Sequence, residues 1–165
     1  METFQSANRA YLLTGGNMGN RERYLEDAAK YISQSCGKIL KESSIYETAA
    51  WGKTDQPNFL NQALLIETTF TADELMKRIL LIEEKLERTR NEKYDARTID
   101  IDILFFNNEI INEPKLIIPH PEIQNRRFAL APMNEIAPEF IHPVLHKNIN
   151  TLLKECADKL DVKKI

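Results

Sequence analysis

Strand-like and helix-like hydrophobic patterns alternate along the first hundred residues in the order β-α-β-β-α-β. Residues 9–14, 38–46, 59–70 and 98–106 are rich in apolar and β-branched residues, which predicts four strands. Apolar residues spaced three and four apart predict one helix between the first two strands and another between the last two. This order indicates an α+β fold in which helices cover a sheet.

Polar residues mark the start of each predicted helix. Asn20 can cap the first helix, because its side chain can accept a hydrogen bond from a free backbone N–H, and Gly37 can end it. Thr71 and Glu74 form a capping box at the start of the second helix, which should run to about Arg90. The buried faces are expected to be Leu25, Ala28, Ala29 and Ile32 on the first helix, and Leu75, Ile79, Ile82 and Leu86 on the second.

The connecting segments and the last third of the chain complete the predicted fold. Gly15, Gly16 and Gly19 should end the first strand in a turn whose backbone could line a pocket, and residues 48–58 should form a long loop. An Asn107-Asn108 turn predicts that residues 109–111 return as a hairpin with the strand before it. The chain is then expected to be irregular up to about residue 146, before a last helix capped by Asn148. That helix would bury Ile149, Leu152, Leu153, Cys156 and Leu160.

These elements predict an α+β fold with a ferredoxin-like βαββαβ core, an antiparallel sheet with helices. A C-terminal hairpin, an irregular segment and a helix would add to it. The length of 165 residues is typical of a single domain, residues 1–165, in which residues 1–8 would be a frayed tail.

The composition excludes several classes of function. With 22 basic and 25 acidic residues and a net charge of −3, the chain is not expected to bind nucleic acid or anionic membranes. No stretch approaches the ~20 apolar residues of a membrane helix, and residues 1–10 lack a signal-peptide core. Cys36 and Cys156 form no metal-ligand pattern and are expected to be core residues of a cytoplasmic protein.

Two carboxylates follow each other on one face of the fourth predicted strand. Because side chains alternate along a strand, Ile99, Ile101, Ile103 and Phe105 should face one side, and Thr98, Asp100 and Asp102 the other. Two unit charges about 6–7 Å apart repel by about 2–3 kcal/mol at an effective dielectric near 20. A divalent cation with a preference for oxygen ligands, such as Mg²⁺, would offset this repulsion. The alternative is that the two residues form the polar face of an amphipathic strand.

Basic residues gather on both sides of this strand. Arg88, Arg90, Lys93 and Arg97 precede it, and Lys115, His120, Arg126 and Arg127 follow it. Cations beside a two-carboxylate metal site are suited to a polyphosphate. A solvated helix end favoured by the helix dipole is the alternative for Arg88 and Arg90. Glu83 borders the buried face of the second helix, where it could orient a loop or an arginine, or be an ordinary boundary carboxylate.

Aromatic residues lie next to loops rather than in regular helical stripes. Trp51, Phe59 and Phe128, with Thr48 and Asn61, could form a slot for a flat heterocycle, since aromatic faces stack on it and polar groups read its edge. Packing in the core is the alternative for these residues.

Several segments together resemble one enzyme family. They are Gly15-Gly16-Asn17, Tyr46-x-Thr48, Asp55-Gln56-Pro57-Asn58-Phe59-Leu60-Asn61, Arg97-Thr98-Ile99-Asp100-Ile101-Asp102, Pro119-His120 and Asn125-Arg126-x-Phe128. In this order and with this spacing, the chain resembles the 6-hydroxymethyl-7,8-dihydropterin pyrophosphokinases of folate biosynthesis. The resemblance implies a ferredoxin-like monomer that transfers pyrophosphate from ATP to the hydroxymethyl oxygen of the pterin and releases AMP.

The resemblance also implies a role for each matching residue. Asp100 and Asp102 would hold two Mg²⁺ ions, and Asp102 is the nearer candidate to assist deprotonation. The pterin would bind to Thr48, Trp51, Phe59, Asn61 and Phe128, with its ring stacked between Phe59 and Phe128. ATP would bind to Glu83, Arg88, Arg97, Lys115, His120 and Arg126. The catalytic set would be Arg88, Arg90, Arg97 and Asp102, with Arg90 in a mobile catalytic loop.

The chain departs from the family pattern in two places. Gly16 stands where family members usually have serine, and Tyr94-Asp95-Ala96 replaces a common Trp-Gly-Pro in a loop that is one residue shorter.

Two other classes of function are alternatives to the enzyme. A nucleic-acid-binding module of the same fold would need exposed aromatic residues on the central strands and a basic face. A regulatory ligand-binding module would not need the Asp pair with its flanking arginines.

Overall fold

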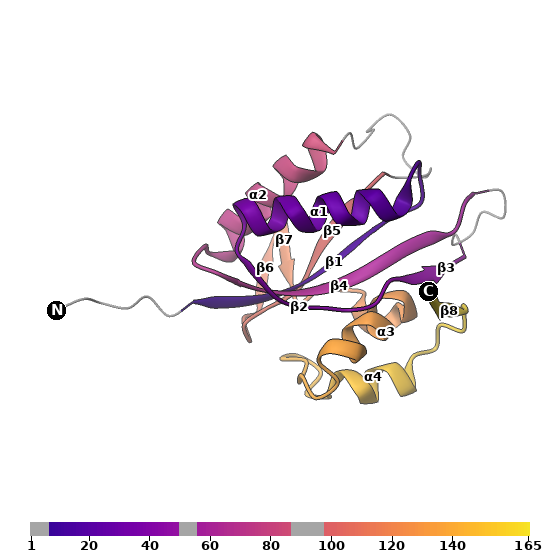
Figure 1. Ribbon diagram of the computed structural model, residues 1–165. Helices are drawn as coiled ribbons and strands as arrows, with labels where there is room; N and C mark the ends of the chain where they lie inside the picture. Colours follow the sequence, from indigo (N-terminus) through magenta and orange to yellow (C-terminus); the bar gives the residue numbers. More distant parts are fainter. Residues whose placement is uncertain (1–6, 50–55, 87–97) are drawn as a thin grey trace.

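The computed structural model describes residues 7–49, 56–86 and 98–165. Its elements follow the predicted order over the first hundred residues, with one additional strand (Figure 1). They are β1 (Asn8–Gly16), α1 (Arg21–Ser35), β2 (Lys38–Glu42), β3 (Tyr46–Thr48), β4 (Phe59–Thr68), α2 (Ala72–Lys85), β5 (Asp100–Phe106), β6 (Ile111–Glu113), β7 (Leu116–Ile118), a 3₁₀ turn (Ile123–Asn125), α3 (Arg127–Ile136), α4 (Ile149–Glu155) and β8 (Val162–Lys164).

The main sheet has the strand order β5-β1-β4-β3-β8, with β2 also paired to β4. Every pairing in it is antiparallel. With β1 and β4 in the centre, and β2 and β3 together in the place of one strand, this is the predicted ferredoxin-like order. The expected strand 38–46 is divided at Ser43, whose hydroxyl accepts a hydrogen bond from the Ala63 N–H at 2.9 Å.

Helices cover both faces of the sheet, α1 and α2 on one side and α3 and α4 on the other (Figure 1). Three apolar clusters lie between these layers. The largest joins α1 and α2 to the sheet through residues such as Ile32 and Ile79, and the second joins α3 and α4 to it through residues such as Leu130 and Leu152. A small third cluster lies between β4 and the end of α3. Burial of this apolar area, at about 25 cal/mol per Å², is the main force that holds the layers together.

The helix starts agree with their predicted caps. Asn20 accepts a hydrogen bond from the Arg23 N–H at 3.1 Å, and Asn148 accepts one from the Thr151 N–H at 2.8 Å. The capping box of Thr71 and Glu74 is present in both directions. The ends differ, since α2 ends at Lys85 rather than near residue 90. The predicted faces of α1 and α2 are buried except for Ala29, which is half-buried. Of the face predicted for the last helix, Ile149, Leu152 and Cys156 are buried, whereas Leu153 and Leu160 are only half-buried.

The glycines after the first strand do not act as predicted. β1 begins at Asn8 and continues through Gly15 and Gly16, so only Gly19, with φ +63°, belongs to the turn. Gly15 is required for a different reason, because a Cβ there would overlap Asn61 Oδ1 and approach the Leu60 carbonyl oxygen to 2.9 Å.

A bulge in β5 changes the predicted alternation. Ile103 pairs with Leu12 and Phe105 with Tyr11, so Leu104 is an extra residue. Because a bulge shifts the residues beyond it to the opposite face, Phe105 packs on the α3 side and Phe106 takes its place beside Ile103. The prediction that Phe105 shares a face with the three isoleucines is wrong.

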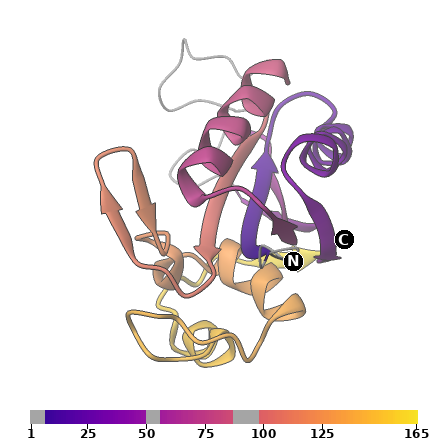
Figure 2. The ribbon, with the colours of Figure 1, turned by 90° about the vertical axis from the view of Figure 1, so that its left-hand side faces the viewer.

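The last third of the chain is more regular than predicted. The hairpin forms between β6 and β7, apart from β5, and stands beside the main sheet (Figure 2). Helix α3 forms around Pro132, which lacks an N–H for the helix, because Leu130 and Met133 are fully buried. Helix α4 ends at Glu155, so Leu160 lies outside it, and β8 adds an unpredicted strand next to β3.

Candidate active site

A cavity of about 530 Å³ lies where β1, β3, β4 and β5 meet the start of α3 and the C-terminal segment. Several of the predicted functional residues line it. They are Thr48, Phe59, Asn61, Asp100, Asp102, Arg126 and Phe128, which come from four different parts of the sequence. The fold thus places both predicted halves of the site, the carboxylates and the aromatic slot, in one cavity.

The two aspartates enter the cavity from β5. They stand at alternate positions of the strand, with Asp100 opposite Gly15 and Asp102 opposite Leu13 on β1, and all four residues line the cavity. The period-two prediction for the Asp pair is therefore confirmed as far as their shared face is concerned. Gly15 lines the cavity as expected, although from a strand and not from a turn.

The polar and aromatic side of the cavity comes from β3, β4 and α3. Thr48 pairs with Phe59 in the sheet, and Asn61 stands opposite Gly15. The Thr48 side chain is buried, and its Oγ1 has no hydrogen-bond partner within the described part of the chain. A buried hydroxyl without a partner is costly, so this atom is suited to a polar group of a ligand.

Hydrogen bonds join two of the motifs that carry the family resemblance, Gly15-Gly16-Asn17 and the segment before Phe59. Asn17 is buried, and its side-chain amide donates to the carbonyl oxygen of Pro57 at 3.0 Å and to Gln56 Oε1 at 3.1 Å. These bonds attach the loop before β4 to the end of β1. They explain why an asparagine follows the two glycines.

Arg126, the N-cap residue of α3, is the basic residue among the described residues that line the cavity. Its guanidinium carbon lies 5.7 Å from the centre of the Phe128 ring. His120 is part-buried nearby, with its backbone N–H bonded to the Leu104 carbonyl oxygen and its Nδ1 accepting from the Glu122 N–H. Burial and the Arg126 charge lower the pKa of His120 to about 4, against the opposing effect of Glu122, so it is neutral at pH 7.

The depressed pKa of His120 predicts a pH dependence of stability. In the unfolded chain this histidine binds a proton below about pH 6.5, whereas in the folded chain it binds one only below about pH 4. Its contribution to the free energy of unfolding is complete above pH 6.5 and should be lost as the pH falls from 6.5 to 4. Urea unfolding at several pH values would measure this, and His120→Gln should flatten the curve in that window. An equal slope in both proteins would contradict the assignment.

Glu83 does not line the cavity but lies behind the Asp pair. It is 5% exposed on α2, and its Oε2 accepts a hydrogen bond from the Ile101 N–H at 2.8 Å. Ile101 is the residue between Asp100 and Asp102, so this bond fixes the backbone that carries both carboxylates.

Removal of Glu83 should therefore weaken the protein. Glu83→Ala leaves the buried Ile101 N–H without this acceptor, and we expect the free energy of unfolding to fall by about 1–3 kcal/mol. The neighbouring Glu84 is exposed, so Glu84→Ala is a matched control that should change stability by less than about 0.5 kcal/mol. Urea denaturation measures both, and equal losses would refute the role given to Glu83.

Other predicted residues are placed elsewhere or lie outside the described residues. Lys115 is exposed in the turn between β6 and β7, and neither it nor His120 lines the cavity. Trp51, Arg88, Arg90 and Arg97, with the departing loop Tyr94-Asp95-Ala96, lie outside the described residues.

Sequence reasoning missed part of the cavity wall. Leu13, Ala49, Glu122, Asn125, Asp158 and Leu160 also line the cavity. Asp158 and Leu160 stand after α4, in a segment where no spacing or motif in the sequence indicated a function. The pairing of β8 with β3 and the hydrogen bond from the Arg127 N–H to Asp158 bring this segment to the site.

The residues present fit Mg²⁺. Within the described residues there is no group of three or more His, Cys, Asp or Glu that could hold a metal ion. Mg²⁺ is commonly held by one or two carboxylates together with water and substrate phosphates. Asp100 and Asp102, at alternate positions of β5 in the cavity wall, would be two such carboxylates.

No helix in the described residues combines the length and the apolar character needed to cross a membrane.

Comparison with known proteins identifies relatives of the chain. The profile of the 7,8-dihydro-6-hydroxymethylpterin-pyrophosphokinase family matches residues 11–138. The 2-amino-4-hydroxy-6-hydroxymethyldihydropteridine pyrophosphokinase of Bacillus subtilis is 44% identical over 133 residues, 80% of each chain. The enzyme of the same name from Aquifex aeolicus is 37% identical over 145 residues, 88% of this chain and 90% of its own.

A solved structure has the same fold. The crystal structure of wild-type HPPK-DHPS from Plasmodium falciparum superimposes with a TM-score of 0.75 over 90% of this chain and 43% of that one, at 22% identity. The fold and the extent of the sequence matches lead to one conclusion: the chain belongs to the 7,8-dihydro-6-hydroxymethylpterin-pyrophosphokinase family.

Proposed function

We propose that this protein transfers the β,γ-pyrophosphoryl group of ATP to the hydroxymethyl oxygen of 6-hydroxymethyl-7,8-dihydropterin, in folate biosynthesis. Family membership and relatives at 37–44% identity with pyrophosphokinase names support the reaction. The observation that carries it is that one cavity is lined both by a pair of aspartates and by aromatic and amide side chains.

In this reaction the hydroxymethyl oxygen forms a bond to the β-phosphorus of ATP. The bond between that phosphorus and the oxygen bridging to the α-phosphorus breaks, AMP leaves, and the hydroxyl proton is lost. Such transfers depend mainly on positioning and on stabilisation of charge. The cavity is suited to both, since aromatic side chains and an arginine line it together with the two carboxylates.

The ring of the pterin would lie between Phe59 and Phe128. Thr48 and Asn61 would bind its polar edge, for which the unpartnered Thr48 hydroxyl is the strongest support. Trp51 would complete this side. On the phosphate side, Arg126 lines the cavity, and we assign Arg88, Arg97, Lys115 and His120 to ATP with it, and Arg90 to a catalytic loop.

Asp100 and Asp102 would hold two Mg²⁺ ions. When bound, these ions neutralise the phosphate charge and lower the pKa of a coordinated hydroxyl. The carboxylates would hold these ions at the cavity wall that also carries the residues of the pterin slot. Glu83 supports them through the Ile101 N–H, so we assign it a positioning role on the ATP side.

The protein is proposed to act as a cytoplasmic monomer. The direct test is to incubate the protein with ATP, Mg²⁺ and 6-hydroxymethyl-7,8-dihydropterin and to separate the nucleotides by chromatography. We expect AMP that depends on both the pterin and Mg²⁺, with EDTA and pterin-free mixtures as controls. Formation of ADP would indicate a kinase with a different cleavage point, and no nucleotide product would indicate a binding module.

A further inference from the structure

The C-terminal segment 157–165 contacts both ends of α3. At the start of the helix, Asp158 Oδ2 accepts a hydrogen bond from the Arg127 N–H at 3.1 Å. At the other end, Lys164 Nζ lies 3.5 Å from Glu135 Oε1. The family profile ends at residue 138, before this segment.

The start of α3 has no cap from its own sequence. Arg126 is the N-cap residue and its side chain makes no capping hydrogen bond. Helix starts leave backbone N–H groups without partners, and a short side-chain oxygen usually accepts from one of them. Here the oxygen comes from Asp158, 31 residues after Arg127. The second carboxylate oxygen, Oδ1, accepts from the Leu160 N–H at 3.0 Å and so fixes the side chain.

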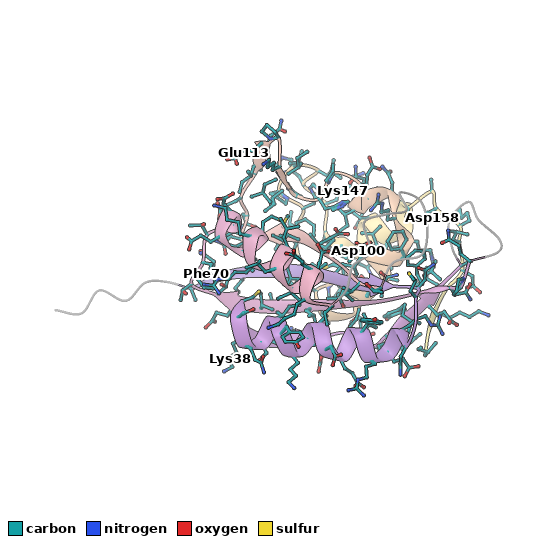
Figure 3. All side chains as sticks on the ribbon, turned by 90° about the horizontal axis from the view of Figure 1, so that it is seen from above. Lys38, Phe70, Asp100, Glu113, Lys147 and Asp158 are labelled. Atoms are coloured by element: carbon teal, nitrogen blue, oxygen red, sulfur yellow. The ribbon has the colours of Figure 1, made fainter. Side chains whose placement is uncertain are left out.

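The capped turn carries two residues of the candidate site. Arg126 precedes the capped N–H and Phe128 follows it, and both line the cavity together with Asp158 and Leu160. In Figure 3, Asp158 lies toward the end of the molecule opposite to Phe70 and Lys38. The cap is therefore part of the cavity wall.

At the far end of α3, Glu135 contacts both Lys164 of the same C-terminal segment and residues at the start of β3. Glu135 accepts hydrogen bonds from Tyr46 Oη at 2.6 Å and from the Ser44 N–H at 2.8 Å, which joins α3 to the start of β3. Strand β8 pairs with β3 so that Val162 stands opposite Thr48. The segment thus connects the strand of Thr48 with the helix of Phe128, the two sides of the proposed pterin slot.

We propose that residues 157–165 act as a strap that sets the position of Arg126 and Phe128, with Asp158 as the positioning residue. This rests on the proposed function, since the slot between β3 and α3 is where the pterin would bind. Without the cap, a smaller fraction of molecules holds both residues in place, which weakens binding of both substrates at unchanged chemistry.

The kinetic test compares Asp158→Ala with Asp161→Ala. Asp161 is in the same segment, is exposed and pairs only with Lys163 at 3.5 Å among the interactions described, so it is a matched control. We expect Asp158→Ala to raise KM for the pterin and for ATP roughly tenfold, with kcat changed by less than about twofold. Asp158→Asn, which keeps one acceptor oxygen, should fall between. A purely structural role would lower the melting temperature and leave both KM values unchanged, and that result would overturn the proposal.

A second measurement does not depend on activity. Hydrogen exchange of the peptide covering residues 123–131 reports the opening of the first turn of α3 in the protein without substrates. We expect faster exchange in Asp158→Ala and Asp158→Asn than in Asp161→Ala. Unchanged exchange would refute the strap even if wild-type protein forms AMP. Conversely, faster exchange with no AMP from wild-type protein would refute the proposed function and leave the strap standing.

Discussion

Asp102→Ala should reduce the Mg²⁺-dependent formation of AMP by at least about a hundredfold. Loss of a single preorganised electrostatic group in an active site typically costs 10²–10³ in kcat. Asp102 lies in the wall of the cavity beside Asp100, and these are the two carboxylates that we assign to the two Mg²⁺ ions. Asp100→Ala is expected to have an effect of similar size.

The same substitutions should leave the fold intact. Both residues are only part-buried, and removing one of two neighbouring like charges relieves repulsion between them. Asp161→Ala, a substitution of an exposed aspartate outside the cavity, is the matched control and should keep full activity. Initial rates of AMP release over a range of Mg²⁺ concentrations, with thermal unfolding of each variant, measure both effects. Turnover near that of the wild type in both aspartate variants would remove the metal assignment.

Gly15→Ala should raise KM for the dihydropterin by about ten- to a hundredfold. Gly15 pairs with Asn61 across the sheet, and an added Cβ would overlap Asn61 Oδ1. The Leu60 carbonyl oxygen would lie 2.9 Å from the added Cβ, so the backbone leaves no free space on that side and the Asn61 side chain has to move. Since Asn61 is assigned to the polar edge of the pterin, its displacement removes a hydrogen-bonding partner of the substrate.

Gly37→Ala separates this effect from a general loss of stability. A Cβ at Gly37 would overlap the Glu67 carbonyl oxygen, at the opposite end of β4 from Asn61. Both variants should lose about 1–3 kcal/mol of unfolding free energy through overpacking. Only Gly15→Ala should change KM for the pterin, while KM for ATP stays within about twofold. Equal KM values for the pterin in the two variants would show that Asn61 does not contact it.

Sequence patterns predicted the structure correctly where the interactions lie within a single helix or strand. The caps at Asn20, Thr71 and Asn148 depend only on residues within one turn, so they could be predicted from the sequence. The bulge at Leu104 could not, because it depends on how β5 pairs with β1. Helix α3 was missed because Pro132 disfavours a helix locally, whereas burial of its apolar face favours one.

Some features of the candidate site were likewise predictable from the sequence, and others depend on the fold. The two carboxylates on one face of a strand follow from period-two alternation, and that alternation is already present in the sequence. The meeting of Asp100 with Thr48, Asn61 and Phe128 depends on the strand order β5-β1-β4-β3 and on the placement of α3. Sequence spacing alone left core packing open as an alternative for the aromatic residues.

The sequence by itself determined the βαββαβ order of the first hundred residues, the Asp pair and, through the combination of several motifs, the resemblance to the family. These are properties of neighbouring residues or of residues in a fixed order along the chain. Only the tertiary structure decided that Asp158 caps a helix 31 residues before it, that Glu83 supports the strand of the Asp pair, and that Gly15 makes room for Asn61. Each of these depends on a contact between segments far apart in the chain, and such contacts are selected by burial and backbone pairing across the whole fold.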